Sequence, residues 1–291
     1  MMKFGIYNSY WERDWGGELT PYVKRVKRLG FDVLEVSFAN SPDTPDEDIR
    51  ELGRVAREEG ILLTAGYGPP KRYDSTSGDP KVVEAGQEYL CRIFQKMDLA
   101  GIRFVGGGLY SYWPVDYSTS IDKPLDWERS VTQMRRTAKT AADFGITLGM
   151  EVLNRFEGYL INTAAECRQY IKDVGAPNLG IMLDTFHMNI EEDNIVSAIH
   201  TAGDMLCHLH VGEANRRLPG PNGLPWDAIG EALRSVGFVG CVVMEPFVRM
   251  GGQIGSDIKV WRDLSGGADD EQLDAMAAES VAFLRDAFAG R

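Results

Sequence analysis

The stretch Thr147-Leu-Gly-Met-Glu151 is a short apolar run that ends in a carboxylate, and Leu179-Gly-Ile-Met-Leu-Asp184 repeats this pattern after an amphipathic stretch. Apolar runs of this length, separated by helical patterns, indicate strands that alternate with helices, and here they recur at intervals of roughly 30 to 40 residues in both directions. Eight strands are expected, at Phe4–Tyr7, Val33–Ser37, Ile61–Ala65, Ile102–Val105, Thr147–Val152, Leu179–Leu183, Met205–Val211 and Cys241–Met244.

Helical patterns fill the intervals between these strands. Three of the clearest run over Pro45–Glu59, Val82–Leu99 and, at the end of the chain, about Asp269–Ala289. Eight strand–helix units without a break in composition, and without a GxGxxG turn after the first strand, favour a closed parallel barrel over a doubly wound sheet. We therefore expect residues 1–291 to form one (β/α)₈ barrel domain, with its active site at the C-terminal ends of the strands.

The composition is typical of a globular protein and limits the partners. The chain carries 43 acidic and 31 basic residues, a net charge of -12, and has no basic block that could follow a nucleic-acid backbone. No run approaches the roughly 18 apolar residues that span a bilayer, and no leader-like segment opens the sequence. The four cysteines are scattered without a CxxC pair. We expect a cytoplasmic protein with no nucleic-acid or membrane partner.

Ionisable residues stand at the ends of four successive predicted strands. Strands five to eight lead to Glu151, Asp184, His210 and Glu245, and equivalent heights would bring these side chains together at the barrel mouth. Any one strand-end acid could equally be a surface group or a helix cap. Like charges gather in a partly dry pocket only when a cation offsets them, so the set predicts a divalent metal site.

The types of ligand limit the ion. Three oxygen donors and one nitrogen suit Mn²⁺, Mg²⁺ or Co²⁺, whereas structural zinc is disfavoured because no cysteine accompanies the set. His208 lies two residues before His210 and deeper in its strand, so we expect it to pack beside the site or support a ligand rather than bind the ion.

Further polar and aromatic residues follow the same strand ends. Glu157, His187, Glu213 and Arg216 could orient the oxygens of a polyol, although each could instead be a loop salt bridge or cap. Aromatic side chains in predicted loops could wall a sugar pocket, although isolated aromatics usually belong to the core. They are Tyr7, Tyr10, Trp11, Trp15, Tyr110, Tyr112, Trp113 and Phe247. The triple glycine Gly106–Gly108 is expected to give room beside strand four.

Four long motifs resemble the D-tagatose/D-psicose (allulose) 3-epimerase family, and D-psicose 3-epimerases within it most closely. They are Glu151-Val-Leu-Asn-Arg-Phe-Glu157, Leu183-Asp-Thr-Phe-His-Met-Asn-Ile-Glu-Glu192, His208-Leu-His-Val-Gly-Glu-Ala-Asn-Arg216 and Met244-Glu-Pro-Phe247. The resemblance extends to Tyr10-Trp11, Ser111-Tyr-Trp-Pro114 and Val260-Trp-Arg-Asp-Leu-Ser-Gly-Gly267, and so covers nearly the whole chain.

The resemblance implies a ketose epimerase that uses Mn²⁺ or Co²⁺ and forms a homodimer or homotetramer. Position by position, it implies that Glu151, Asp184, His210 and Glu245 bind the metal and that Glu151 and Glu245 are also the acid/base pair. It further implies that Glu157, His187 and Arg216 hold the first three oxygens of the substrate. Tyr7, Trp113 and Phe247 then face the far end of the sugar.

The expected reaction is inversion at C3 of a free ketose through a cis-enediolate. Two opposed bases are needed, and Glu151 and Glu245 could flank the carbon. Expected substrates are the pairs D-psicose/D-fructose and D-tagatose/D-sorbose, with L-ribulose/L-xylulose a further candidate. Aldose–ketose isomerisation uses the same chemistry and remains an alternative, as does a non-catalytic sugar-binding barrel. A sugar-phosphate epimerase and a multi-metal nuclease are less favoured, because the chain lacks a phosphate cradle and has four histidines.

Overall fold

A computed structural model describes residues 1–290 and shows a closed barrel of eight parallel strands in sequential order, β1 to β8. Each strand pairs with its neighbours in the sequence, and β8 closes the ring by pairing with β1. This confirms the predicted (β/α)₈ fold. The strands are β1 (Lys3–Tyr7), β2 (Val33–Ser37), β3 (Leu62–Gly66), β4 (Phe104–Gly107), β5 (Thr147–Glu151), β6 (Leu179–Asp184), β7 (Leu206–Val211) and β8 (Cys241–Met244).

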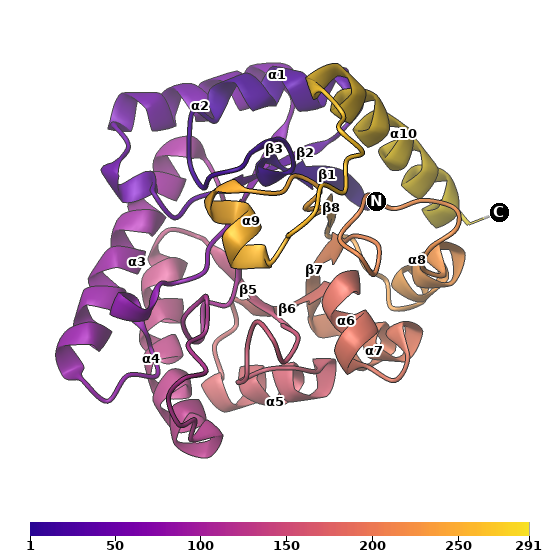
Figure 1. Ribbon diagram of the computed structural model, residues 1–291. Coiled ribbons are helices and arrows are strands. Elements are labelled where there is room, and N and C mark those ends of the chain that lie inside the picture. The colour runs from indigo at the N-terminus through magenta and orange to yellow at the C-terminus, as the bar shows by residue number, and fades with distance from the viewer. Residues whose placement is uncertain (291) are drawn as a thin grey trace.

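The helices surround the strands in an outer ring, except α9 (Gly252–Ile258), which lies in front of the barrel (Figure 1). They are α1 (Thr20–Arg28), α2 (Asp46–Glu59), α3 (Pro80–Ala100), α4 (Lys123–Asp143), α5 (Ala164–Val174), α6 (Thr185–Glu191), α7 (Ile195–Ala202), α8 (Trp226–Ser235), α9 (Gly252–Ile258) and α10 (Asp270–Phe288). Among residues 1–290, none of these helices is long and apolar enough to cross a membrane.

The predicted strand positions agree with the structure to within two residues at each end. The largest shift is at β4, which begins at Phe104 rather than at Ile102 and continues through the glycines to Gly107. Pairing explains the difference: Gly106 and Gly107 are in register with Gly149 and Met150 of β5. Glycine has low strand propensity, so the sequence pattern ends the strand too early.

The glycines of β4 and β5 make room inside the barrel. A Cβ on Gly106 would lie 2.2 Å from Sδ of Met182, and one on Gly149 would lie 2.6 Å from the Phe104 ring. Gly107 has φ +131°, and a Cβ there would lie 2.2 Å from the carbonyl oxygen of Tyr67. The side chains of Met182 and Phe104 thus occupy the space that Gly106 and Gly149 leave free, and Gly107 allows the close approach of the Tyr67 backbone. Room beside strand four, as the triple glycine predicts, is confirmed.

The segment after β8 lies against the loop after β1. Trp15 Nε1 donates to Asp257 at 2.8 Å, the backbone N–H of Gln253 donates to Asp14 at 2.8 Å, and the N–H of Ile254 donates to the carbonyl of Arg13 at 2.9 Å. These bonds hold α9 over the C-terminal ends of the strands, where Figure 1 shows it in front of the barrel. The first and last strand–loop units therefore close the mouth together.

Candidate active site

The four strand-end residues named from the sequence come together at the barrel mouth. Glu151 and Asp184 end β5 and β6, His210 is the penultimate residue of β7, and Glu245 follows β8. Asp184 and His210 are register partners, and one ligand atom from each of the four residues lies within 4.8 Å of the others. Three of these residues are buried and Glu245 is half-buried, and the set could hold a metal ion, which is the arrangement the sequence predicts.

The ring of His210 faces two ways. Its Nδ1 lies 3.4 Å from Oε1 of Glu245 and 3.7 Å from Oε1 of Glu151, and this buried atom has no hydrogen-bond partner. Its Nε2 forms a short hydrogen bond with Oε1 of Glu35, on the other side of the barrel. With the proton of the neutral ring on Nε2, the lone pair is on Nδ1 and points at the carboxylates.

The carboxylates differ in how many oxygens are free. One oxygen of Asp184 caps α6 by accepting the N–H of Phe186 at 2.7 Å, which leaves Oδ2 for the pocket. Burial, reinforced by the charge of Glu245, raises the pKa of Glu151 well above its usual range. The cluster therefore has an excess of negative charge that a cation would offset.

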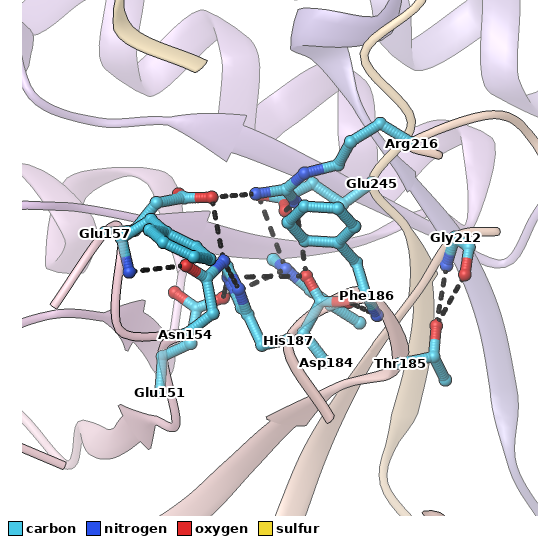
Figure 2. Close-up of polar contacts among 12 residues, drawn as sticks. Glu151, Asn154, Glu157, Asp184, Thr185, Phe186, His187, Gly212, Arg216 and Glu245 are labelled. Atoms are coloured by element: carbon cyan, nitrogen blue, oxygen red, sulfur yellow. Dashed lines mark hydrogen bonds and ion pairs between the residues drawn. The ribbon is translucent and has the colours of Figure 1, made fainter. Parts of the chain in front are cut away.

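Arg216 connects three of the acids. Its guanidinium lies 2.8 Å from Glu157, 3.1 Å from Glu245 and 3.4 Å from Asp184 (Figure 2). The same group stacks 3.8 Å above the ring of Phe186. The backbone of Arg216 is left-handed, with φ +66°, a conformation that non-glycine residues rarely adopt and that concentrates at functional sites. This turn directs the side chain back toward the strand ends.

Asn154 determines the orientation of His187. The side-chain oxygen of Asn154 accepts the N–H of Phe156 at 2.9 Å, so its amide nitrogen faces Nδ1 of His187 at 2.7 Å. An amide nitrogen can only donate, hence Nδ1 accepts and Nε2 carries the proton. Nε2 points into the cluster, 3.8 Å from both Glu151 and Asp184 (Figure 2). Burial lowers the pKa of His187, which favours this neutral donor.

A cavity of about 80 Å³ adjoins the cluster and is walled by aromatic side chains. Tyr7, Trp15, Trp113 and Phe247 line it, and Trp15 packs edge-to-face against both Trp113 and Phe247 at 6.0 and 6.2 Å. Glu151, Glu157, His187, His210, Arg216 and Glu245 line the polar side. The residues that the family resemblance implies as substrate contacts therefore all line this cavity, as do three of the four predicted metal ligands; Asp184 does not line it.

Other aromatic candidates lie elsewhere. Tyr10 donates to the carbonyl of Leu273 and Trp11 to Asp274, so both pack against α10. Tyr110 is buried behind the site, where its hydroxyl donates to the backbone carbonyl of Glu151 at 2.6 Å. Tyr112 is also absent from the cavity lining. The predicted position of these aromatic residues in loops does not determine which way their side chains face. Of the two interpretations, a wall of the sugar pocket or ordinary packing, the structure supports packing for these four.

Two further polar candidates have structural contacts. Glu213 accepts hydrogen bonds from the N–H groups of Gly220 and Leu224 and from Trp226, and so fixes the loop after β7. His208 stacks on Phe104 at 4.3 Å and lies 2.9 Å from Glu35, outside the four-residue group. Glu35, His208 and His210 form the second group among the described residues that could hold an ion.

The sequence patterns miss two residues of the site, Glu35 and Asn154. Glu35 is completely buried in the middle of β2, and although burial opposes ionisation, His208 and His210 hold its pKa well below the usual range. An acid inside an otherwise apolar strand was the available signal. Asn154 is only an uncharged member of the 151–157 motif, and nothing in the sequence distinguishes its role.

Comparison with known proteins agrees with this geometry. Residues 23–287 match the family described as the xylose isomerase-like TIM barrel. The D-psicose 3-epimerases of Ruminiclostridium cellulolyticum and Agrobacterium fabrum are each 49% identical to the chain over 284 residues, which covers 98% of the chain and 97% and 98% of those proteins. The chain belongs to the D-psicose 3-epimerase family. The predicted family resemblance is thereby confirmed.

A solved D-psicose 3-epimerase, crystallised in the presence of D-fructose, superposes on the chain with a TM-score of 0.97. It is 48% identical, and the match covers 99% of this chain and all of that one. Membership of the D-psicose 3-epimerase family places the chain among the carbohydrate epimerases, enzymes of the isomerase class.

Proposed function

We propose that the protein catalyses metal-dependent C3 epimerisation of free ketoses, with D-psicose/D-fructose, D-tagatose/D-sorbose and L-ribulose/L-xylulose as the substrate pairs. The observation that carries the proposal is the convergence of Glu151 and Glu245, from β5 and β8, on one pocket that also contains Nδ1 of His210. Family membership supports the reaction class, since the relatives are named D-psicose 3-epimerases.

The residues fit a divalent ion. The unpartnered, buried Nδ1 of His210 faces an excess of carboxylate charge, and a set of three oxygen donors and one nitrogen suits Mn²⁺, Co²⁺ or Mg²⁺. Glu151, Asp184, His210 and Glu245 would hold it. When bound, such an ion offsets the carboxylate charge and acts as a Lewis acid toward the sugar's oxygens.

Glu151 and Glu245 are the proposed acid/base pair. Inversion at C3 requires one group to remove the proton beside the ketone and another to return a proton to the opposite face of the planar enediolate. Burial and the neighbouring charge of Glu245 raise the pKa of Glu151, and such a shifted carboxyl is suited to accepting a proton. Asp184 has one oxygen committed to the α6 cap, and so is assigned to holding the ion alone.

His187, Arg216 and Glu157 are the proposed substrate contacts. The Nε2–H of His187 points into the pocket as a neutral donor for a sugar oxygen. Arg216 presents its fixed fork of donors at the same pocket and is held there by Glu157 and by Phe186. Tyr7, Trp113 and Phe247 exclude water and contact the far end of the sugar.

A deuterium-labelling experiment tests the proposal. Metal-stripped protein should be inactive, and protein reloaded with Mn²⁺ and incubated with D-fructose in deuterated water should incorporate deuterium at C3 as D-psicose forms. Label at C1 would instead establish aldose–ketose isomerisation. Binding of the ketose without any exchange would support a non-catalytic sugar-binding barrel.

Three further properties expected from the sequence remain predictions. They are one domain over the whole chain, a cytoplasmic location, and a homodimer or homotetramer. Exposed apolar side chains support an assembly, since Phe156 and Trp261 are 72% and 71% exposed and line one groove beside the mouth. Light scattering after gel filtration measures the oligomeric state directly, and a monomer at micromolar concentration would contradict the prediction.

A further inference from the structure

Glu35 is a buried acid that the proposed mechanism does not use. It stands at the centre of β2, where all five residues are buried, and its own exposure is 0%. Its side chain crosses the barrel interior to contact His208 and His210 on β7, a strand with which β2 does not pair. An ionisable group in this position is costly unless all its bonds are made, and so calls for an explanation.

Both oxygens of Glu35 are engaged. Oε1 accepts the short hydrogen bond from Nε2 of His210. Oε2 accepts a hydrogen bond from the hydroxyl of Thr64, its register partner on β3, at 2.7 Å, and lies 2.9 Å from Nε2 of His208. His208 is itself held by its stack on Phe104, with an interplanar angle of 13°. The carboxylate is therefore held by contacts from two other strands, β3 and β7.

The bond to Glu35 controls which nitrogen of His210 is available. Because Nε2 donates to the carboxylate, the neutral ring presents its lone pair at Nδ1, the atom that lies 3.4 Å from Glu245. Without an acceptor at Oε1, the ring could rotate or exchange its tautomer, and Nδ1 would no longer be reserved for an ion. Carboxylates that orient ligating histidines in this way change metal affinity by about 10- to 100-fold when they are removed.

We propose that Glu35 is a positioning residue for the metal site: it acts through His210 and does not touch the ion or the substrate. The inference rests on the proposed function, because it assigns His210 as a metal ligand. It predicts that Glu35 sets metal affinity, whereas the Glu151 and Glu245 pair sets the rate of proton transfer.

The test is a titration of metal-stripped protein with Mn²⁺. Binding is measured by calorimetry or by the electron paramagnetic resonance signal of free Mn²⁺. Glu35→Gln, which preserves shape but removes the charge, should raise the Mn²⁺ dissociation constant about 10- to 100-fold. Saturating Mn²⁺ should restore most of kcat. Glu35→Asp should give an intermediate affinity, because it retains the carboxylate at a shorter reach. Thr64→Val, which removes a hydrogen bond from Oε2 but leaves the contact with His210, is the matched control and should change the constant less than about threefold.

A spectroscopic measurement separates positioning from general stability. In Mg²⁺-loaded protein, the Nε2–H proton of His210 should give a slowly exchanging downfield resonance that moves upfield or is lost in Glu35→Gln, because an amide oxygen is a weaker acceptor than a carboxylate, and that is retained in Thr64→Val. Affinity of Glu35→Gln within threefold of the wild type would overturn the inference. If Glu35→Gln does not fold, Glu35→Asp decides the question by the same measurements. If wild-type protein binds Mn²⁺ but does not epimerise ketoses, the proposed function fails while the role of Glu35 in metal binding stands.

Discussion

The two halves of the barrel mouth differ in chemistry. Strands β5 to β8 lead to Glu151, Asp184, His210 and Glu245, whereas β1 to β4 end in Tyr7, Ser37, Gly66 and Gly107. The first set supplies charge, and the second supplies space and, with the loops that follow it, most of an aromatic wall that Phe247 after β8 completes. The comparison suggests that reactivity and sugar preference belong to different halves of one pocket. Mutations should therefore separate them.

Glu245→Gln should have the largest effect. Loss of one member of the acid/base pair is expected to lower kcat by about 10³-fold, within the range for general acid–base catalysis, while circular dichroism shows an intact barrel. Steady-state kinetics on D-fructose at saturating Mn²⁺ measure the change. Glu128→Gln, at an exposed position on α4, is the control and should have no effect. Near-normal turnover of Glu245→Gln with metal bound would refute the two-base scheme.

Gly107→Ala tests whether the uncharged half contributes room. The new Cβ would lie 2.2 Å from the carbonyl oxygen of Tyr67 at a backbone φ of +131°, so we expect a loss of about 2–3 kcal/mol in the free energy of unfolding. Urea denaturation measures it. Gly145→Ala is a useful comparison, because φ there is +64° but no atom lies within 4 Å of the added Cβ. An equal loss in both variants would show that backbone strain, rather than the close approach, sets the cost.

Asn154→Leu tests the role assigned to His187 in the charged half of the mouth. The substitution leaves Nδ1 of His187 without its donor, and an unsatisfied buried group costs about 1–3 kcal/mol. If that cost falls on the transition state, kcat/KM drops between about 5-fold and about 150-fold. The Mn²⁺ dissociation constant should hardly change, since Asn154 contacts none of the four proposed ligands. A large loss of Mn²⁺ affinity would place Asn154 among the groups that support the ion.

Trp113→Phe should have the smallest effect and the most selective one. Trp113 lines the cavity on the uncharged side, so its replacement is expected to change the ratio of kcat/KM for a ketohexose and a ketopentose by about 10-fold. The Mn²⁺ dissociation constant should equal that of the wild type within experimental error. An equal fall in activity toward both sugars would show that this wall holds the substrate without distinguishing its length.

Much of the fold and the charged half of the site could be predicted because they follow local rules. Strand ends alternate with helices along the chain, and in a parallel barrel every strand end lies on one face, so Glu151, Asp184, His210 and Glu245 had to be neighbours. The boundaries of β4 could not be predicted, since the pairing of Gly106 and Gly107 with β5 overrides their low propensity.

The parts that escaped prediction depend on contacts across the barrel. Glu35 meets His210 only because β2 and β7 face each other through the interior, and a separation of 175 residues leaves no local pattern. The aromatic residues show the same limit: Trp15 enters the cavity, whereas Trp11, four residues earlier, turns outward to Asp274 on α10. Side-chain direction in a loop is decided by its tertiary neighbours rather than by its sequence.

The hydrogen bond between Trp15 and Asp257 has a consequence for exchanging parts between related barrels. A chimera joined in the loop before β5 would take its charged cluster from one parent and most of its aromatic wall from the other. Trp15 and Asp257 would then come from different parents, although they must match for α9 to lie across the mouth. Grafting a new sugar preference therefore requires transferring residues 11–17 and 251–258 as a pair.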